Sequence, residues 1–230
     1  MISEYAFSYA NLKVDLPSVI RVLGYDKTDF PEPFKSYLEQ AVMDCKRMTG
    51  FRGAFLVKDK VAMGMQKNSV RVDGIDFQVG RTIFHELKGS ERLAFFVCTA
   101  GKAISEKSSQ LLHGEDPVLG YIYDVLGSAI VEAVGDQVQQ MISLEAEKAG
   151  KKITNRYSPG YCHWDVADQH NLFPLFGQSP CGVTLTPSAL INPVKSISGV
   201  IGIGEHVVFR DYQCGLCKQK NCVYREKRRG

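Results

Sequence analysis

The ten residues RYSPGYCHWD (156–165) gather side chains of the kinds that hold small molecules. Arg156 carries a planar fork of N–H donors, which matches the geometry of a carboxylate or a phosphate. The two tyrosines supply flat faces for a ring system, and Pro159-Gly160 predicts a tight turn that lets a ligand approach the backbone. Two interpretations stay open: a surface turn with a solvated Arg156, or a loop that binds a ligand.

A second chemically active residue, Glu132, lies in GSAIVEAVGD (127–136) beside an apolar helical stripe. It either faces water, since Glu is a good helix former, or accepts hydrogen bonds from an ammonium group. Arg for a carboxylate and Glu for an amine is the pair that a bound amino acid requires. An aromatic loop next to that pair suits an adenine.

The C-terminal run CGLCKQKNC offers three thiols, Cys214, Cys217 and Cys222. Two thiolates in a C-x-x-C turn can reach one ion, so zinc or an iron–sulfur cluster is one reading. Redox-active thiols and free thiols on a tail are the alternatives. The candidates for a fourth ligand are Cys162, Cys181, His163 and His206, although a partly buried loop histidine is the simpler expectation for His163.

The strongest element expected around these residues is a helix over 117–148. Its apolar stripe comprises Ile122, Val125, Leu126, Ala129, Ile130, Ala133, Val134, Val138, Met141 and Ile142. Gly127 and Gly135 interrupt it and suggest close packing against a sheet or a ligand. Other helices are expected within 16–25, 34–48, 81–90, 101–113 and 170–177, and strands within 53–59, 69–79, 93–101, 181–188, 196–204 and 207–212.

Length and composition favour one globular α+β domain with a mostly antiparallel sheet and flanking helices. The 230 residues are 44% hydrophobic and 23% charged, and the net charge of +3 is too small to indicate nucleic-acid binding. No segment has the roughly 18 consecutive apolar residues of a membrane helix, and the N-terminus does not read as a signal peptide. We therefore expect a cytoplasmic protein.

The runs LGSAIVEAVGD, RYSPGY and NPVKSISGVIGIG resemble, in order and spacing, the activation domain of cobalamin-dependent methionine synthase in its free-standing form. The resemblance is firm over 115–205, and it divides the chain into an activation-domain-like part (1–205) and a Cys-rich basic segment (206–230). The family signature Arg-x-x-Pro-Gly-Tyr corresponds to Arg156, Pro159, Gly160 and Tyr161. Its Ser-x-Ser-Gly segment corresponds to Ser196, Ser198 and Gly199.

The resemblance implies an S-adenosylmethionine site. Arg156 would hold the methionine carboxylate and Glu132 the amino group, while Ser158 and Tyr161 would border the adenosine and Gly160 would permit its approach. The acidic residue that full-length synthases use near the start of the domain has only Asp15 as a candidate counterpart. A tyrosine late in that domain has no match here.

The resemblance also implies a function, namely reductive methylation of cob(II)alamin on a separate cobalamin-dependent methionine synthase, with a flavodoxin-like reductant. Cobalamin would be carried by the partner, and no catalytic side chain is expected. One alternative is a metal- or iron–sulfur-containing module that docks on another corrinoid protein and passes electrons. An ordinary small-molecule methyltransferase is disfavoured, because no Gly-rich loop stands between an early strand and helix.

Overall fold

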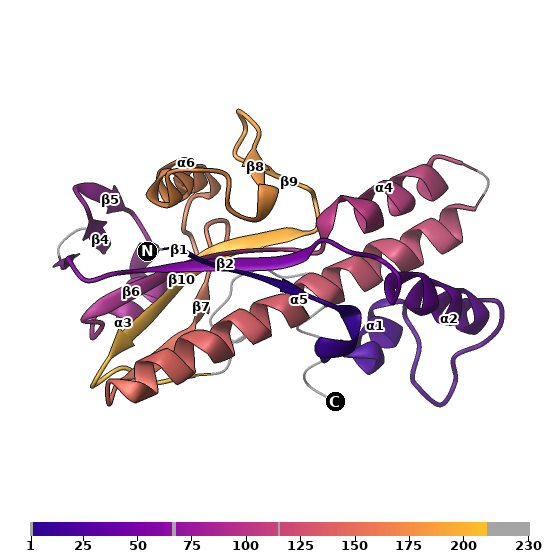
Figure 1. The fold of residues 1–230 in the computed structure, drawn as a ribbon, viewed down its shortest axis with the longest axis horizontal. Helices are drawn as coiled ribbons and strands as arrows, with labels where there is room; N and C mark the ends of the chain where they lie inside the picture. The colour runs from indigo at the N-terminus through magenta and orange to yellow at the C-terminus, as the bar shows by residue number, and fades with distance from the viewer. Residues whose placement is uncertain (1, 66–67, 115, 211–230) are drawn as a thin grey trace.

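The computed structural model of the protein describes residues 2–65, 68–114 and 116–210. Its centre is a five-stranded sheet in the order β1-β2-β6-β10-β7, in which each neighbouring pair is antiparallel. The five strands are β1 (Ile2–Phe7), β2 (Phe51–Lys58), β6 (Arg92–Thr99), β7 (Lys152–Tyr157) and β10 (Ser196–Gly204). Helices flank this sheet, which confirms the α+β prediction (Figure 1).

The long helix α5 (Pro117–Lys148) runs along one face of the sheet and contacts β2, β6, β10 and β7 (Figure 1). Three further helices pack against α5: α1 (Leu16–Val22), α2 (Phe34–Cys45) and α4 (Gly101–Leu112). The opposite face carries α3 (Gly80–Leu87), α6 (Gln169–Leu172), the small sheet of β3 (Val61–Gly64), β4 (Ser69–Val72) and β5 (Ile75–Phe77), and the pair β8 (Thr184–Leu185) and β9 (Ile191–Asn192). Short 3₁₀ turns complete the described chain: η1 (Tyr9–Asn11), η2 (Val166–Asp168), η3 (Phe173–Phe176) and η4 (Pro180–Gly182).

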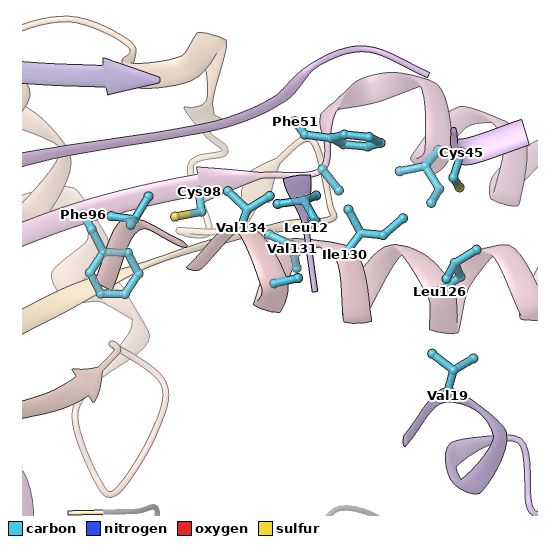
Figure 2. Close-up of a cluster of buried hydrophobic side chains, with 14 of the residues drawn as sticks. Leu12, Val19, Cys45, Phe51, Phe96, Cys98, Leu126, Ile130, Val131 and Val134 are labelled. Carbon is cyan, nitrogen blue, oxygen red and sulfur yellow. The ribbon is translucent and has the colours of Figure 1, made fainter. Parts of the chain in front are cut away.

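The sheet separates two hydrophobic cores, because alternate side chains of a strand point to opposite faces. On β6, Phe96 and Cys98 face α5, whereas Phe95 and Val97 belong to the core on the other side. The α5-side core also takes Leu126, Ile130 and Val134 from the helix, together with Leu12, Val19, Cys45 and Phe51 from the N-terminal third (Figure 2). Helix α5 therefore lines this core, and side chains on the α5 face of the sheet pack against it.

Helix α5 begins where the sequence indicates. The Asp116 carboxylate caps it by accepting the Leu119 backbone N–H at 3.0 Å, and Pro117 occupies the first turn. Of the described helices, α5 is the one with the length and composition of a membrane span, yet 67% of its most apolar 18-residue window is buried inside the protein. Burial against the sheet accounts for this apolar character.

Several elements differ from the sequence expectations. Strands β1, β3, β7 and β9 were not predicted, and Arg156 lies near the end of strand β7 rather than in a loop. The strand expected over 207–212 is wrong for residues 207–210, which have no regular structure, and its last two residues lie outside the described chain. The proposed boundary between 205 and 206 remains a prediction. Metal binding by Cys214, Cys217 and Cys222 likewise remains a prediction, because these three residues lie outside the described residues.

Candidate functional site

The structure brings Arg156 and Glu132 together. Arg156 Nη2 lies 3.0 Å from Glu132 Oε2, and Arg156 Nη1 lies 2.7 Å from Asp136 Oδ1. The Arg156 side chain is 7% exposed, whereas those of Glu132 and Asp136 are 57% and 66% exposed. A mostly buried guanidinium thus meets two carboxylates of α5 that remain open to water.

A β-bulge directs Arg156 towards α5. Its pairing partner on β10 is Ile201, while Ile153 pairs with Ile203, so Thr154 and Asn155 together stand opposite Gly202. The extra residue lets both Ile153 and Arg156 face the helix, although they are an odd number of positions apart. Bulges commonly re-aim a side chain in this way beside functional sites.

Side chains hold the bulge in place. The Thr154 hydroxyl accepts the Gly202 backbone N–H at 2.8 Å, and the Asn155 side-chain oxygen accepts the Arg156 N–H at 2.8 Å. The Asn155 amide also donates to the carbonyl of Arg210 at 3.0 Å, close to the end of the described chain. The backbone that carries Arg156 is therefore fixed by its two preceding residues.

Two glycines make room for this arrangement. A Cβ on Gly135 would lie 3.4 Å from Arg156 Cζ and 2.9 Å from the Ile197 Cδ1 methyl, so this glycine lets the guanidinium lie against the helix. A Cβ on Gly199 would lie 2.3 Å from the Tyr157 carbonyl oxygen and 2.9 Å from Ser158 Oγ. Gly199 therefore permits β10 to approach the first residues of the predicted ligand loop.

The loop itself leads from the end of β7, which is an edge strand, to Trp164 in the core on the face opposite α5. Gly160 has φ +95°, and its N–H donates to the Trp164 carbonyl at 2.8 Å. Trp164 is 2% exposed, meets Phe77 edge-on at 6.3 Å between ring centroids, and donates its indole N–H to Asp168 at 2.6 Å. The indole thus anchors one end of the loop, while β7 anchors the other.

Between these anchors lie the remaining predicted ligand residues. Ser158 is half-buried beside Gly199, Gly160 is exposed, and Tyr161 is 69% exposed. A tyrosine with this exposure presents a ring face to solvent in the protein alone. Their roles towards adenosine remain predictions.

The two serines of the Ser-x-Ser-Gly segment point away from Arg156. Ser198 Oγ donates to Gln169 Oε1 of α6 at 2.6 Å, and Ser196 Oγ donates to Thr99 Oγ1 at 2.8 Å. Gly199 of this segment adjoins Tyr157 and Ser158. In this chain the serines fasten β10 to its surroundings, and the glycine shapes the site.

Sequence reasoning missed a row of polar residues on α5. Asp124, Ser128, Glu132 and Asp136 recur every four positions and so lie along one face of the helix. Lys195, whose side chain is 11% exposed, donates to Asp124 Oδ1 at 2.7 Å and to Ser128 Oγ at 3.0 Å. The four-residue spacing places Asp124, Ser128 and Asp136 on the same helix face as Glu132, and this spacing is the signal that could have identified them.

The thiol beneath the site stays protonated. Burial raises the pKa of Cys98 well above its ordinary value, and Cys181 adds to this effect while Arg156 opposes it. A buried neutral thiol behaves as a small apolar side chain rather than a nucleophile.

Other residues weighed in the sequence have different placements. Asp15 caps α1 by accepting the Ser18 N–H at 3.0 Å. His163 is exposed, with φ +68°, so the expectation of a partly buried side chain is wrong. Within residues 2–65, 68–114 and 116–210, no group of three His, Cys, Asp or Glu side chains is arranged to hold a metal ion.

Comparison with known proteins places this geometry in a family. None of the curated proteins compared with the chain matches it. A solved structure, that of the MetH reactivation domain bound to AdoHcy, matches with a TM-score of 0.67 at 12% sequence identity, over 92% of this chain and 80% of that chain. At this identity the likeness shows a shared fold.

The family model described as the activation domain of vitamin B12 dependent methionine synthase matches residues 82–230, well over half of the sequence. This chain therefore belongs to the family of vitamin B12 dependent methionine synthase activation domains.

Proposed function

We propose that this protein binds S-adenosylmethionine beside α5 and supports reductive methylation of cob(II)alamin carried by a separate cobalamin-dependent methionine synthase. The observation that carries the proposal is the mostly buried Arg156 guanidinium next to the half-exposed Glu132 carboxylate in a member of this family. The related reactivation domain was solved with AdoHcy, the molecule that S-adenosylmethionine becomes when it loses its methyl group.

Each group of the ligand then has a partner of suitable chemistry. The Arg156 fork suits the methionine carboxylate, and the Glu132 carboxylate suits the amino group. Ser158, Gly160 and Tyr161 follow Arg156 within five residues and would border the adenosine, with Gly160 leaving the backbone accessible. A Cβ at Gly160 would meet no atom closer than 3.9 Å, so space adjoins this part of the turn.

The reaction needs little from the protein beyond positioning, because the sulfonium already activates the methyl group. One electron from a reductant such as a flavodoxin-like protein, and the methyl group from the sulfonium, convert the partner's cob(II)alamin to methylcobalamin. The C–S bond breaks, and S-adenosylhomocysteine leaves as a neutral thioether. The side chains of this chain hold the methionine end so that the methyl group points at the partner.

Replacing the guanidinium tests the binding step. We expect Arg156→Ala to weaken S-adenosylmethionine binding by about 2–5 kcal/mol, as when one partner of a buried charged pair is removed. Calorimetric titration of the wild type and the variant with S-adenosylmethionine and with S-adenosylhomocysteine measures this loss. Equal affinity of the two proteins would remove Arg156 from the site.

The control is Lys195→Gln, which removes the other mostly buried cation that pairs with α5. If Arg156→Ala acted only by loosening the helix, Lys195→Gln would weaken binding equally. Thermal unfolding of both variants shows how much stability each has lost, so that binding can be compared at matched stability.

The second step is tested by reconstitution. A cobalamin-dependent methionine synthase that lacks an activation domain is brought to the cob(II)alamin state and supplied with a reductant and S-adenosylmethionine. We expect activity to return only when this protein is added, and the cob(II)alamin spectrum to convert to that of methylcobalamin. Tight ligand binding without any spectral change would leave a binding protein and contradict the reactivation role.

A further inference from the structure

The Arg156 guanidinium has carboxylates of the same helix on both of its terminal nitrogens. Asp136 Oδ1 lies 2.7 Å from Nη1, and Glu132 Oε2 lies 3.0 Å from Nη2. Two negative charges thus surround one positive charge, in a place where the guanidinium is 7% exposed. An incoming carboxylate would be a third anion at a single cation.

A carboxylate binds Arg most strongly through two parallel N–H···O bonds. Each terminal nitrogen carries two N–H groups and already donates one to a protein carboxylate. A ligand carboxylate that takes the fork therefore meets the negative charges of Glu132 and Asp136, and this repulsion falls when one of them moves away. Glu132 is the residue proposed to turn to the ligand's amino group, which leaves Asp136 as the group on the Nη1 edge. The Asp136 side chain is 66% exposed and can return to water at little solvation cost.

We infer that Asp136 is a built-in competitor for the ligand carboxylate and so sets the affinity of the site for ligands that carry one. This inference rests on the proposed function. In the free protein Asp136 neutralises and orients Arg156, and in the complex the carboxylate of the ligand takes its place on Nη1. The position is a specificity determinant rather than a ligand contact, because it acts by vacating the guanidinium.

The same helix supplies a matched control. Asp124 lies three helical turns earlier, pairs with Lys195 at 2.7 Å, and has a 39% exposed side chain. Asp124→Asn therefore removes an α5 carboxylate from the mostly buried cation Lys195 and leaves Arg156 and its partners unchanged. Asp136→Asn and Asp124→Asn make the same change in charge and keep the side-chain shape.

The experiment is calorimetric titration of the wild type, Asp136→Asn and Asp124→Asn with three ligands. S-adenosylmethionine and S-adenosylhomocysteine carry the carboxylate, and 5′-methylthioadenosine lacks both the carboxylate and the amino group. We expect Asp136→Asn to bind the first two about two- to fivefold more tightly, the range for release of a partly exposed ion pair. Its affinity for 5′-methylthioadenosine, and the affinities of Asp124→Asn for all three ligands, should match the wild type.

Unchanged or weaker binding of S-adenosylmethionine by Asp136→Asn would overturn the inference, and so would an equal gain with Asp124→Asn. Asp136→Ala serves as a second variant with the same expected direction, and thermal unfolding checks that both fold. If the wild type binds and Asp136→Asn gains nothing, the inference alone fails. If neither the wild type nor any variant binds S-adenosylmethionine, the proposed function fails and the inference fails with it.

Discussion

Gly199 shows how one missing side chain shapes the site. Its strand, β10, pairs with β6 on one side and β7 on the other, so it lies within the sheet rather than at an edge. A Cβ there would come within 2.3 Å of the Tyr157 carbonyl oxygen, closer than real Cβ contacts allow, and would lie tightly at 3.0 Å from the Phe96 ring. Because the nearest atom belongs to the backbone of β7, relief requires β10 to move away from the end of β7.

We expect Gly199→Ala to lower the free energy of unfolding by about 1–3 kcal/mol, as for other overpacked cores, and to weaken S-adenosylmethionine binding. Urea unfolding and calorimetric titration measure the two effects. Gly89→Ala is the control, because the nearest atom to its Cβ would be 3.9 Å away. If Gly199→Ala were as stable as Gly89→Ala, the close approach would have no importance for the fold.

The sequence identified Arg156 and Glu132 before the structure placed them side by side, because their chemistry and the family motifs pointed to the same pair. It did not identify Asp136, since an acid on a helix is usually a solvated residue. The four-residue spacing places Asp136 on the same face as Glu132 but does not show that this face meets Arg156. The partner of Lys195 was hidden for the same reason. Contacts between a strand and a helix depend on the twist and register of the sheet, which residue spacing within one segment does not fix.

The bulge in β7 is the element-scale feature on which Arg156 depends. Without the extra residue opposite Gly202, strand alternation would turn either Ile153 or Arg156 away from α5. The Thr154 hydroxyl holds this geometry by accepting the Gly202 N–H at 2.8 Å and donating to the Asn155 carbonyl at 2.9 Å. Thr154 is fully buried, so water does not replace these bonds.

We expect Thr154→Val to cost about 1–3 kcal/mol of stability, the penalty for leaving a buried N–H without an acceptor. Because the bulge also aims Arg156, S-adenosylmethionine binding should weaken as well. The control is Ser108→Ala, which removes a buried hydroxyl that donates to the Gly120 carbonyl at 3.0 Å between α4 and α5. That control should lose stability but keep its affinity, and equal losses of affinity would show that only general stability matters.

Elements with a strong signal of their own were predictable. Helix α5 matches its expected range, since its capping Asp116, its Pro117 and its long apolar stripe all agree. Strand β7 was missed because KITNRY has no regular alternation, and the bulge is the physical cause: two of its residues oppose one partner residue. VVFRDY has the composition of a strand, yet residues 207–210 pair with no strand in the described chain.

At the scale of the whole molecule, the sheet and its helices seal three thiols inside. Cys45 and Cys98 lie in the core on the α5 face, and Cys181 lies in the core on the opposite face. Burial is the main cause that raises the pKa of Cys45 from 9.0 to about 12, and burial followed by Glu4 does the same for Cys181. Both cores therefore require these thiols to remain neutral.

This requirement predicts an alkaline limit to stability. Between about pH 9 and pH 12 the thiols of the unfolded chain release their protons while those of the folded protein retain them. The folded state then binds more protons than the unfolded state, so the free energy of unfolding falls as the pH rises through this window. Urea unfolding at pH 7, 9, 10 and 11 under reducing conditions should show a decline in the free energy of unfolding that starts near pH 9.

The double variant Cys45→Ala/Cys181→Ala should start from a lower stability at pH 7, because two buried side chains are truncated, but its decline between pH 9 and pH 11 should be shallower. Burial raises the pKa of Tyr9 and of Tyr123, and Cys45 adds to both increases, so the difference between the two slopes reports the two thiols together with these neighbouring tyrosines. Identical slopes would mean that the two cores admit a charge at these positions and that the folded protein opens around them before it unfolds.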